Sequence, residues 1–436
     1  MHTQPGTYVL GTLSTGEGVP LLQVDRRRHV YIVGQTGTGK TGLLLNLMHA
    51  DMLAGEGFCF LDPHGDACKD IAGMTPAART NDVIYLDPSD ATHTFAYNPL
   101  SGVPAESRAT AAANMVSAFK GIWAQSWGPR LEYILTNALR LLLDSRDQSL
   151  IGLPRLLTDD AYREWLLKRC DDPVIRAYWR SEYAAYDMRF RNEAIAPIQN
   201  KVGTLLANPF IRSILCQNSS TLDFARTMNE GRVLIVNLSK GNLGTEPAHL
   251  LGALLITAFA QAAEARRNTP ENERRDFTLY VDEFQNFATE SFASILSEAR
   301  KWRLSLVAAN QHVSQLPESL REAVFGNAGT LVVFRVGAHD SEHLAAELGL
   351  NNVRALTQTN NFHAWVRLMR DGAPLEPRAV QTNSPPLNGA RLRKVIAHAR
   401  ARHMMSRGLV ESRIVELYSR SSSNRRTKGK KRDADN

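Results

Sequence analysis

A glycine-rich turn between a strand pattern and a helix pattern constrains this chain more than any other feature. An apolar run at residues 29–33 leads into G-x4-G-K-T, and a helical run follows at residues 42–54. Glycines let backbone N–H groups turn inward around a phosphate, and the helix N-terminus adds positive potential. A purely structural turn is the alternative, but the complete order of strand, turn and helix disfavours it. We therefore predict a nucleotide-phosphate loop formed by Gly34, Gln35, Thr36, Gly37, Thr38, Gly39, Lys40 and Thr41.

Lys40 and Thr41 have chemical tasks of their own in such a loop. The Lys40 ammonium would bridge the β- and γ-phosphates of ATP, and the Thr41 hydroxyl would bind Mg²⁺. A second strand pattern, at residues 277–281, ends in Asp282 and Glu283. Asp282 would hold Mg²⁺, and Glu283 would accept a proton from the water that attacks the γ-phosphate. The alternative is a strand that simply ends in two solvated acids. The phosphate loop elsewhere in the chain disfavours this alternative, so Asp282 and Glu283 together predict an ATPase.

Two further strand patterns end in polar residues that can reach the same phosphates. Gln311 follows the run at 304–308, and a polar side chain at the carboxyl edge of an open α/β sheet can sense the γ-phosphate. A plain loop residue is the alternative for Gln311. Asp62 follows the run at 57–61 and is expected to hydrogen-bond the waters around Mg²⁺. For His64 a role in stabilising the turn is at least as good an interpretation, and we predict no metal site there.

Arginines near these strands are candidates for completing a neighbouring subunit's site. Many phosphoryl-transfer enzymes use such an arginine, because it neutralises charge on the transferred phosphate. Arg300, which ends a helix pattern just before the run at 304–308, is the preferred candidate, and Arg335 is the second. For each residue alone, a surface or ion-pairing role is the more ordinary interpretation.

Short apolar runs alternate with helical stretches along much of the chain. This predicts an α/β fold with a RecA-like, mostly parallel sheet flanked by helices. The strand patterns are short and rich in branched and aromatic side chains, as buried parallel strands are. They span residues 29–33, 57–61, 83–86, 233–237, 277–281, 304–308 and 330–335. Helical patterns at residues 109–119, 131–143, 161–169 and 174–186 replace them in between and predict an all-α insertion.

These patterns divide the chain into segments. An N-terminal extension (1–28) precedes the first part of the ATPase core (29–100), the all-α insertion (101–229) and the second part of the core (230–385). A basic helical segment (386–418) and a disordered basic tail (419–436) follow. Aromatic residues of the insertion could form a recognition surface, but filling the core of a small bundle is the preferred interpretation. They are Trp123, Trp127, Tyr133, Trp165, Tyr178, Trp179, Tyr183 and Tyr186.

Charge is distributed unevenly along the chain. Residues 391–436 hold 14 lysines and arginines against 4 acids, a net charge of +10, which leaves −3 of the total of +7 for the rest. This asymmetry is typical of an arm that binds a polyanion such as DNA, although basic tails also raise solubility. The four cysteines are scattered and are expected to be reduced thiols. The apolar stretch at 250–263 is too short for a membrane span, so we expect a core helix in a cytoplasmic protein.

Taken together, several stretches resemble the FtsK/HerA superfamily of DNA-pumping ATPases, and within it the conjugative coupling ATPases of type IV secretion. The resemblance covers residues 28–382. It rests on VGQTGTGKT at 33–41, LDPHGD at 61–66, FAYNPL at 95–100, VNLSKG at 236–241, LYVDEFQNF at 279–287, SEARKW at 297–302, AANQ at 308–311 and GNAGTLVVFRVG at 326–337.

This resemblance implies a ring, usually hexameric, with DNA in the central channel and ATP sites between subunits. The residues that match the family's ATP-site motifs are Lys40, Thr41, Asp282, Glu283 and Gln311. Arg300 lies in the family's arginine-containing helix end. The all-α insertion corresponds to the domain that faces the DNA-processing complex.

The chain departs from membrane-anchored members of this superfamily, which begin with transmembrane helices, because it begins almost directly with the ATPase core. The expected partners are DNA, further copies of the chain, and a relaxosome or type IV secretion membrane partner. Such a partner would place the protein peripherally at the inner membrane. A protein-pumping or assembly ATPase, a soluble DNA-processing ATPase, and a scaffold that binds ATP without turnover are the alternatives, and the acids Asp282 and Glu283 argue against the scaffold.

Overall fold

The structure of the protein is a computed structural model that describes residues 7–289 and 291–416. These residues form two compact units. The first unit comprises the residues up to Leu86, Ser117–Ala124 and Asp223–Ala399. The second comprises Asp87–Val116, Gln125–Leu222 and the segment from Arg400 onward. The predicted tail at residues 419–436 lies outside the described residues.

An 11-stranded sheet forms the centre of the first unit, in the order β2-β1-β14-β11-β10-β3-β9-β8-β4-β7-β5. The strands from β10 to β5 are all parallel to their neighbours. They are β10 (Thr330–Val333), β3 (Val30–Val33), β9 (Leu304–Asn310), β8 (Phe277–Val281), β4 (Gly57–Asp62), β7 (Val233–Asn237) and β5 (Val83–Leu86). Each predicted strand is present with boundaries that differ by at most about two residues. The predicted α/β class with a mostly parallel sheet is confirmed.

Four antiparallel strands extend this sheet beyond β10, and the sequence did not predict them. They are β1 (Thr7–Thr12), β2 (Gly18–Leu22), β11 (His363–Arg367) and β14 (Arg378–Gln381). In β2 and β11 only every second side chain is buried. Such strands lack the continuous apolar run that marks the buried parallel strands, and the alternation is too short to be distinctive. Part of the segment predicted as an N-terminal extension is therefore an edge of the sheet.

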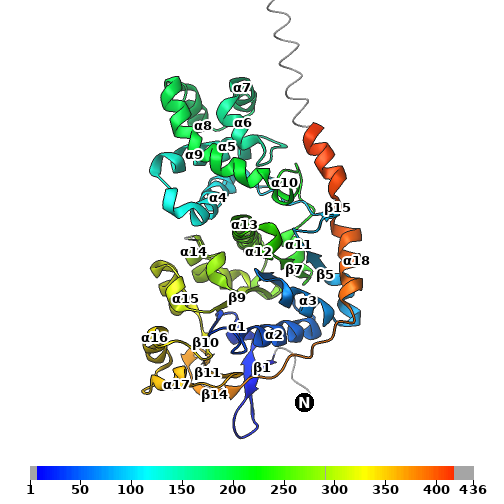
Figure 1. Cartoon of the computed structure of the whole chain (residues 1–436), viewed down its shortest axis with the longest axis vertical. Helices are drawn as coiled ribbons and strands as arrows, with labels where there is room; N and C mark the ends of the chain where they lie inside the picture. The colour runs from blue at the N-terminus through cyan, green and yellow to red at the C-terminus, as the bar shows by residue number, and fades with distance from the viewer. Residues whose placement is uncertain (1–6, 290, 417–436) are drawn as a thin grey trace, which may run out of the picture. The chain divides into compact units, whose positions relative to one another are not determined.

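Helices cover both faces of the parallel strands (Figure 1). Val30 and Ile32 of β3 share one core with α2 (Lys40–Ala54) and α3 (Asp66–Gly73). On the other face lies the long helix α13 (Thr245–Glu264), where the Phe259 ring stacks on Phe277 with centroids 5.2 Å apart. By length and composition the helical stretch Thr245–Asn268 could cross a membrane, yet 72% of its apolar window is buried in the structure. This burial agrees with the predicted core helix.

A buried ion pair joins the helix after the phosphate loop to the strand before the acid pair. The Arg26 guanidinium, at the end of α1 (Gln23–Arg26), donates to the two carboxylate oxygens of Asp51 at 2.7 and 2.6 Å. It also donates to the Thr278 hydroxyl of β8 at 3.0 Å. Buried charges need such pairing. The network therefore holds α2, which begins at Lys40, against β8, which ends before Asp282.

Further helices of the first unit connect these strands. They are α11 (Phe224–Asn229), α12 (Lys240–Leu243), α14 (Ser291–Glu298), α15 (Glu318–Asn327), α16 (Ala338–Leu348) and α17 (Arg354–Thr357). A short hairpin of β12 (Met369–Arg370) and β13 (Ala373–Pro374) completes the unit. The four cysteines, all among the described residues, are buried and form no disulfide, which agrees with the predicted reduced thiols.

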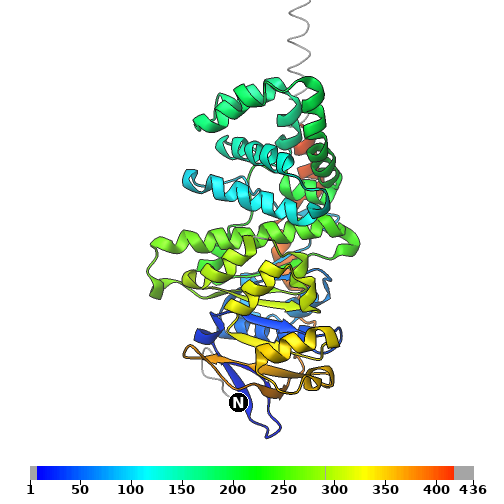
Figure 2. The same ribbon diagram turned by 90° about the vertical axis from the view of Figure 1, so that its left-hand side faces the viewer.

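The second unit is mainly helical. It contains most of α4 (Arg108–Trp123), α5 (Pro129–Asp144), α6 (Gly152–Thr158), α7 (Asp160–Leu167), α8 (Pro173–Ala177), a π-helical turn (Tyr178–Glu182), α9 (Met188–Ala207) and α10 (Pro209–Leu215) (Figure 2). Polar side chains begin several of these helices by accepting N–H groups of the first turn, as N-caps do. The capping residues of α7, α8 and α10 are Asp159, Asp172 and Asn208.

The aromatic residues of this helical unit have two kinds of surroundings. Tyr178, Trp179 and Tyr183 are buried, and the Trp179 and Tyr183 rings contact each other with centroids 4.6 Å apart. Tyr133 and Trp165 are exposed. The preferred interpretation, that these residues fill a core, therefore holds for the first group and not for the second.

The basic C-terminal segment is helical as predicted but is interrupted. Helix α18 (Leu392–His403) ends before the two-residue strand β15 (Met405–Ser406), and a second helical stretch covers residues 407–416. Strand β15 pairs with β6 (His93–Thr94), which breaks the helix. The buried Arg407 guanidinium donates to the carbonyls of Pro88 and Asp90 at 3.1 and 2.7 Å. Arg407, although part of the basic segment, therefore stabilises its own unit through hydrogen bonds to backbone carbonyls.

His29 joins the start of β3 to two other elements of the core. Its Nδ1 accepts the N–H of Leu306 at 3.0 Å, and its Nε2 lies 2.8 Å from the carbonyl of Leu296. Burial lowers the pKa of His29 to about 4, an effect that the Leu296 carbonyl opposes and the Arg300 charge assists. The folded state therefore holds a neutral imidazole at pH values where an unfolded histidine, with its ordinary pKa of about 6.5, is protonated.

The stability that His29 contributes is expected to be present above pH 6.5 and to be lost as the pH falls toward 4. The reason is that the unfolded chain binds more protons than the folded chain in this window. Between pH 7 and 5 the loss from this group is about 2 kcal/mol. Urea unfolding of the parent and of His29→Gln, which is neutral throughout, measures the difference. The exposed His339→Gln is the control, and equal pH dependence of parent and His29→Gln would contradict the prediction.

Candidate active site

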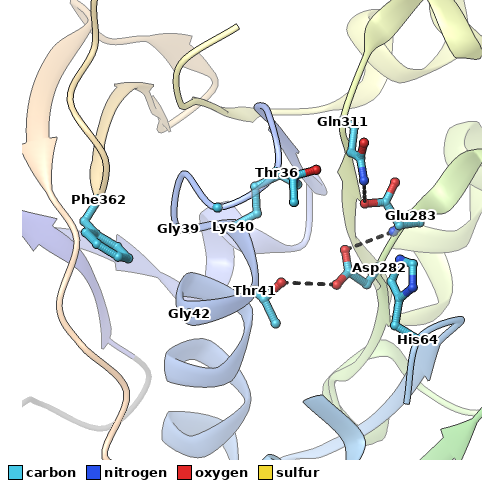
Figure 3. A pocket seen from close by; sticks show the side chains of 11 residues that line it. Thr36, Gly39, Lys40, Thr41, Gly42, His64, Asp282, Glu283, Gln311 and Phe362 are labelled. Carbon is cyan, nitrogen blue, oxygen red and sulfur yellow. Dashed lines mark hydrogen bonds between the residues drawn. The ribbon is translucent and has the colours of Figure 1, made fainter. Parts of the chain in front are cut away.

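A cavity of about 350 Å³ opens beside the phosphate loop at the carboxyl edge of the parallel strands (Figure 3). It is lined by Thr36, Gly37, Gly39, Lys40, Thr41, Gly42, His64, Asp282, Glu283, Gln311 and Phe362. The Thr41 hydroxyl lies 3.4 Å from a carboxylate oxygen of Asp282, although the two residues are 241 positions apart in the chain. The fold thus brings the two halves of the predicted site to one place.

The phosphate loop has a backbone that needs its glycines. Gly39 has φ +121, and a Cβ there would lie 3.0 Å from the Phe334 ring. A Cβ on Gly34 would lie 2.5 Å from Cβ of Phe334, closer than atoms can approach. The buried Thr38 hydroxyl donates to the carbonyl of Gln35 at 2.7 Å and closes the turn. The loop is therefore shaped by three residues that do not line the cavity, Gly34, Gln35 and Thr38. The other predicted loop residues line the cavity.

Lys40 is buried at the start of α2 and points back into its own loop. Its Nζ donates to the carbonyls of Gly34 and Gln35 at 2.6 and 3.2 Å. Burial lowers the pKa of Lys40, and the nearby charges of Glu283 and Asp282 oppose this effect. The ammonium is therefore held at the centre of the loop, where an anion can replace its carbonyl partners.

Asp282 lies in a crowded group of carboxylates. The pKa of Asp282 is raised to about 6, first by burial and then by the negative charges of Asp62 and Glu283, while the Lys40 charge and the Glu283 N–H oppose this shift. Buried acids that share a single ammonium favour an additional cation. Mg²⁺ prefers oxygen ligands, and the Thr41 hydroxyl and the Asp282 carboxylate can supply them from opposite sides of the cavity. The donor set therefore fits this ion.

Glu283 has an unusual backbone that directs its carboxylate. Its φ of 47° and ψ of 53° are left-handed, which costs roughly 1 kcal/mol or more for a residue other than glycine. The two carboxylate oxygens accept amide N–H groups from Gln311 and Gln285, each at 2.8 Å. The Asn310 amide in turn donates to Gln285 Oε1 at 2.7 Å. A chain of amides thus fixes the orientation of the Glu283 carboxylate at the cavity.

Gln285 is a functional candidate that the sequence reasoning missed. It belongs to the 3₁₀ turn Phe284–Asn286 that directly follows Glu283. The position of Gln285 two residues after the acid was a usable signal, because side chains two apart in such a turn can meet.

Asp62 and His64 belong to one turn beside the cavity. The buried Asp62 carboxylate accepts the backbone N–H groups of His64 at 2.8 Å and Cys68 at 3.4 Å. His64 lines the cavity, whereas Asp62 is not among the lining residues. Asp62 therefore acts on the cavity by its negative charge near Asp282 and by holding the turn that carries His64.

The two candidate arginines do not line the cavity of their own chain. Arg300 is exposed, in the 3₁₀ turn Ala299–Trp302. The Arg335 Nε lies 3.4 Å from the side-chain oxygen of Gln35, behind the phosphate loop. Neither position gives a guanidinium that reaches the acids from within the same chain.

Comparisons with known proteins give relatives of this chain in sequence and in fold. The family described as "Type IV secretion-system coupling protein DNA-binding domain" matches residues 13–382. A curated relative, the type 4 coupling protein DotL of Legionella pneumophila subsp. pneumophila, is 21% identical over 381 residues, which cover 72% of this chain and 48% of DotL. The chain thus spans about half the length of this relative.

Solved structures share the fold. The bacterial conjugative coupling protein TrwBΔN70 is 17% identical, with a TM-score of 0.65 over 89% of this chain and 91% of that one. VirB4 of Thermoanaerobacter pseudethanolicus is 14% identical, with a TM-score of 0.57 over 88% of this chain and 98% of that one.

Proposed function

Since the chain belongs to the family of type IV secretion-system coupling protein DNA-binding domains, we propose that it is an ATPase that moves DNA for a conjugative or secretion apparatus. The observation that carries the proposal is the meeting of Lys40, Thr41, Asp282, Glu283 and Gln311 at one cavity. ATP and Mg²⁺ fit its ammonium, hydroxyl and carboxylate groups. TrwB, which shares the fold, has been solved with ADP and Mg²⁺ and with an ATP analogue, and this supports the same ligands here.

The residues at the cavity divide the work of hydrolysis in the proposed mechanism. Loop N–H groups and the Lys40 ammonium would bind the phosphates. Thr41 and Asp282 would hold Mg²⁺, which would supply positive charge that neutralises the phosphates. The Glu283 carboxylate accepts a proton from the attacking water. Gln311 orients that carboxylate through its amide and is the proposed sensor of the γ-phosphate. The low exposure of Asp282 and Glu283 strengthens these interactions, because water is largely excluded.

A ring assembly is the finer part of the proposal. The family resemblance implies a hexamer with ATP sites between subunits, and the exposed position of Arg300 is compatible with donation to a neighbour's site. DNA would lie in the channel, and a relaxosome or a membrane component of the secretion apparatus would be the further partner. On this proposal the protein acts in the cytoplasm, peripherally at the inner membrane.

ATP turnover with and without DNA tests the proposed function. We expect single- or double-stranded DNA to raise the turnover rate at low salt, and the effect to fade as salt increases, because contact with the phosphate backbone releases counterions. Heparin serves as a polyanion control that offers charge without a DNA backbone. If neither single- nor double-stranded DNA changes the rate of ATP turnover at low salt, the proposed movement of DNA is contradicted. The proposed ATPase activity would still hold.

A further inference from the structure

Phe362 is an exposed aromatic residue at the wall of the polar cavity. Its side chain is 57% exposed and lines the cavity together with Gly39, Thr41 and Gly42. Figure 3 shows the phosphate loop between the Phe362 ring on one side and Asp282, Glu283 and Gln311 on the other. The ring therefore lies at the end of the cavity opposite the acids. An apolar ring left open to solvent in this position does not serve the core.

The backbone of Phe362 is strained and held by three hydrogen bonds. Its φ of 63° is left-handed, a conformation that is unfavourable for a bulky residue. The Phe362 N–H donates to the Thr38 carbonyl of the phosphate loop at 2.7 Å. Its carbonyl accepts the Thr382 N–H at 2.8 Å and the Thr382 hydroxyl at 3.0 Å. Strain that the surrounding structure maintains in this way is concentrated at functional sites.

The ring is also fixed against the loop by packing. A Cβ on Gly39 would lie 3.2 Å from Cδ1 of Phe362, so the ring edge lies directly against this glycine. Because the Phe362 N–H is bonded to Thr38, the ring and the phosphate loop keep one spacing. A ligand that is bound through its phosphates therefore meets the ring at a constant distance along its length.

From this arrangement we propose that Phe362 is the platform on which the base of a bound nucleoside triphosphate stacks. The proposal rests on the proposed ATPase function, since the phosphates must occupy the loop. The acids mark the γ-phosphate end of the ligand, so the base lies toward the other side of the loop, where the ring is. Stacking uses the face of a base and not its hydrogen-bonding edge, so the platform suits adenine and guanine alike.

Binding of ATP, GTP and inorganic tripolyphosphate, each with Mg²⁺, tests the platform in Phe362→Leu and Phe362→Trp. Leucine keeps an apolar contact with Gly39 but has no aromatic face, and tryptophan keeps the face. We expect Phe362→Leu to lower the binding affinity for ATP and for GTP by about tenfold each. Tripolyphosphate has no base, so its affinity should stay at the parent value and report an intact loop. Phe362→Trp should bind all three ligands as the parent does.

Three other outcomes would overturn the inference in distinguishable ways. If Phe362→Leu binds ATP as tightly as the parent, or loses as much affinity for tripolyphosphate as for ATP, then Phe362 is not a stacking platform. The proposed ATPase function is not contradicted by either result. A parent protein that binds none of the three ligands removes the proposed function and the platform with it. Steady-state kinetics gives an independent readout, because loss of stacking raises KM with little change in kcat, whereas a distorted loop lowers kcat as well.

Discussion

Glu283→Gln is expected to lower kcat for ATP hydrolysis by about 10² to 10⁴-fold, with ATP affinity nearly unchanged. The substitution removes the carboxylate that would accept the proton of the attacking water and preserves the shape of the side chain. Its effect on the fold should be small. A glutamine has one acceptor oxygen for the two amide donors of Gln311 and Gln285, so roughly one hydrogen bond of about 1 kcal/mol is lost.

Single-turnover hydrolysis and equilibrium ATP binding measure the two parts of this prediction separately. Glu318→Gln is the matched control, because Glu318 is an exposed glutamate at the start of α15. It should hydrolyse ATP at the parent rate. Equal single-turnover rates for Glu283→Gln and the parent would show that this carboxylate is not the base.

Lys40→Ala is expected to weaken ATP binding and to lower turnover by about 10²-fold or more, because the main positive charge facing the phosphates is removed from a site that largely excludes water. A second effect acts in the same direction. The Lys40 charge lowers the pKa of Asp282, so without the ammonium the pKa of Asp282 rises, more of this acid is protonated at a given pH, and it would bind the Mg²⁺ that accompanies ATP less well. Both effects follow from the placement of one ammonium among the carboxylates.

Nucleotide titration and steady-state turnover of Lys40→Ala test this expectation, together with a mass measurement of the assembly with and without nucleotide. Lys69→Ala is the control, since Lys69 is an exposed lysine on α3 that does not line the cavity. If Lys40→Ala binds ATP as tightly as the parent, the phosphates do not occupy this loop. The placement of the ligand would then have to be abandoned, whatever DNA does to the turnover rate.

Much of the parallel core was predictable because its information is local. A buried parallel strand is a short continuous apolar run, and each of the predicted runs is a strand of the sheet. The antiparallel strands β1, β2, β11 and β14 were not predicted, because at most half of the residues in each are buried and because some of their pairings join distant segments. Thr12, for example, pairs with Gln381.

In the candidate site too, residues within local motifs were predicted, and residues that act through tertiary contacts were not. Lys40, Thr41, Asp282, Glu283 and Gln311 were named from motifs, and the fold brings all of them to one cavity. Gln285 was overlooked, although its position two residues after Glu283 is a local signal. Phe362 was not named, because it matters through contacts with Thr38 and Gly39 of a distant segment. The interruption of the basic segment at β15 was missed for a similar reason, since its cause is pairing with His93 and Thr94.

The amino-acid sequence was sufficient to establish the phosphate loop, the acid pair and the alternation of strands and helices, since each depends on neighbours along the chain that set backbone geometry and side-chain spacing. Only the tertiary structure decided that the amides of Gln311 and Gln285 donate to the Glu283 carboxylate. It also decided that Lys40 is buried and that an aromatic ring lies against Gly39. The Gln311 amide comes from 28 positions beyond Glu283, and the Phe362 ring comes from a segment hundreds of residues after Gly39. Their distances are set by strand order and register, which no local pattern specifies.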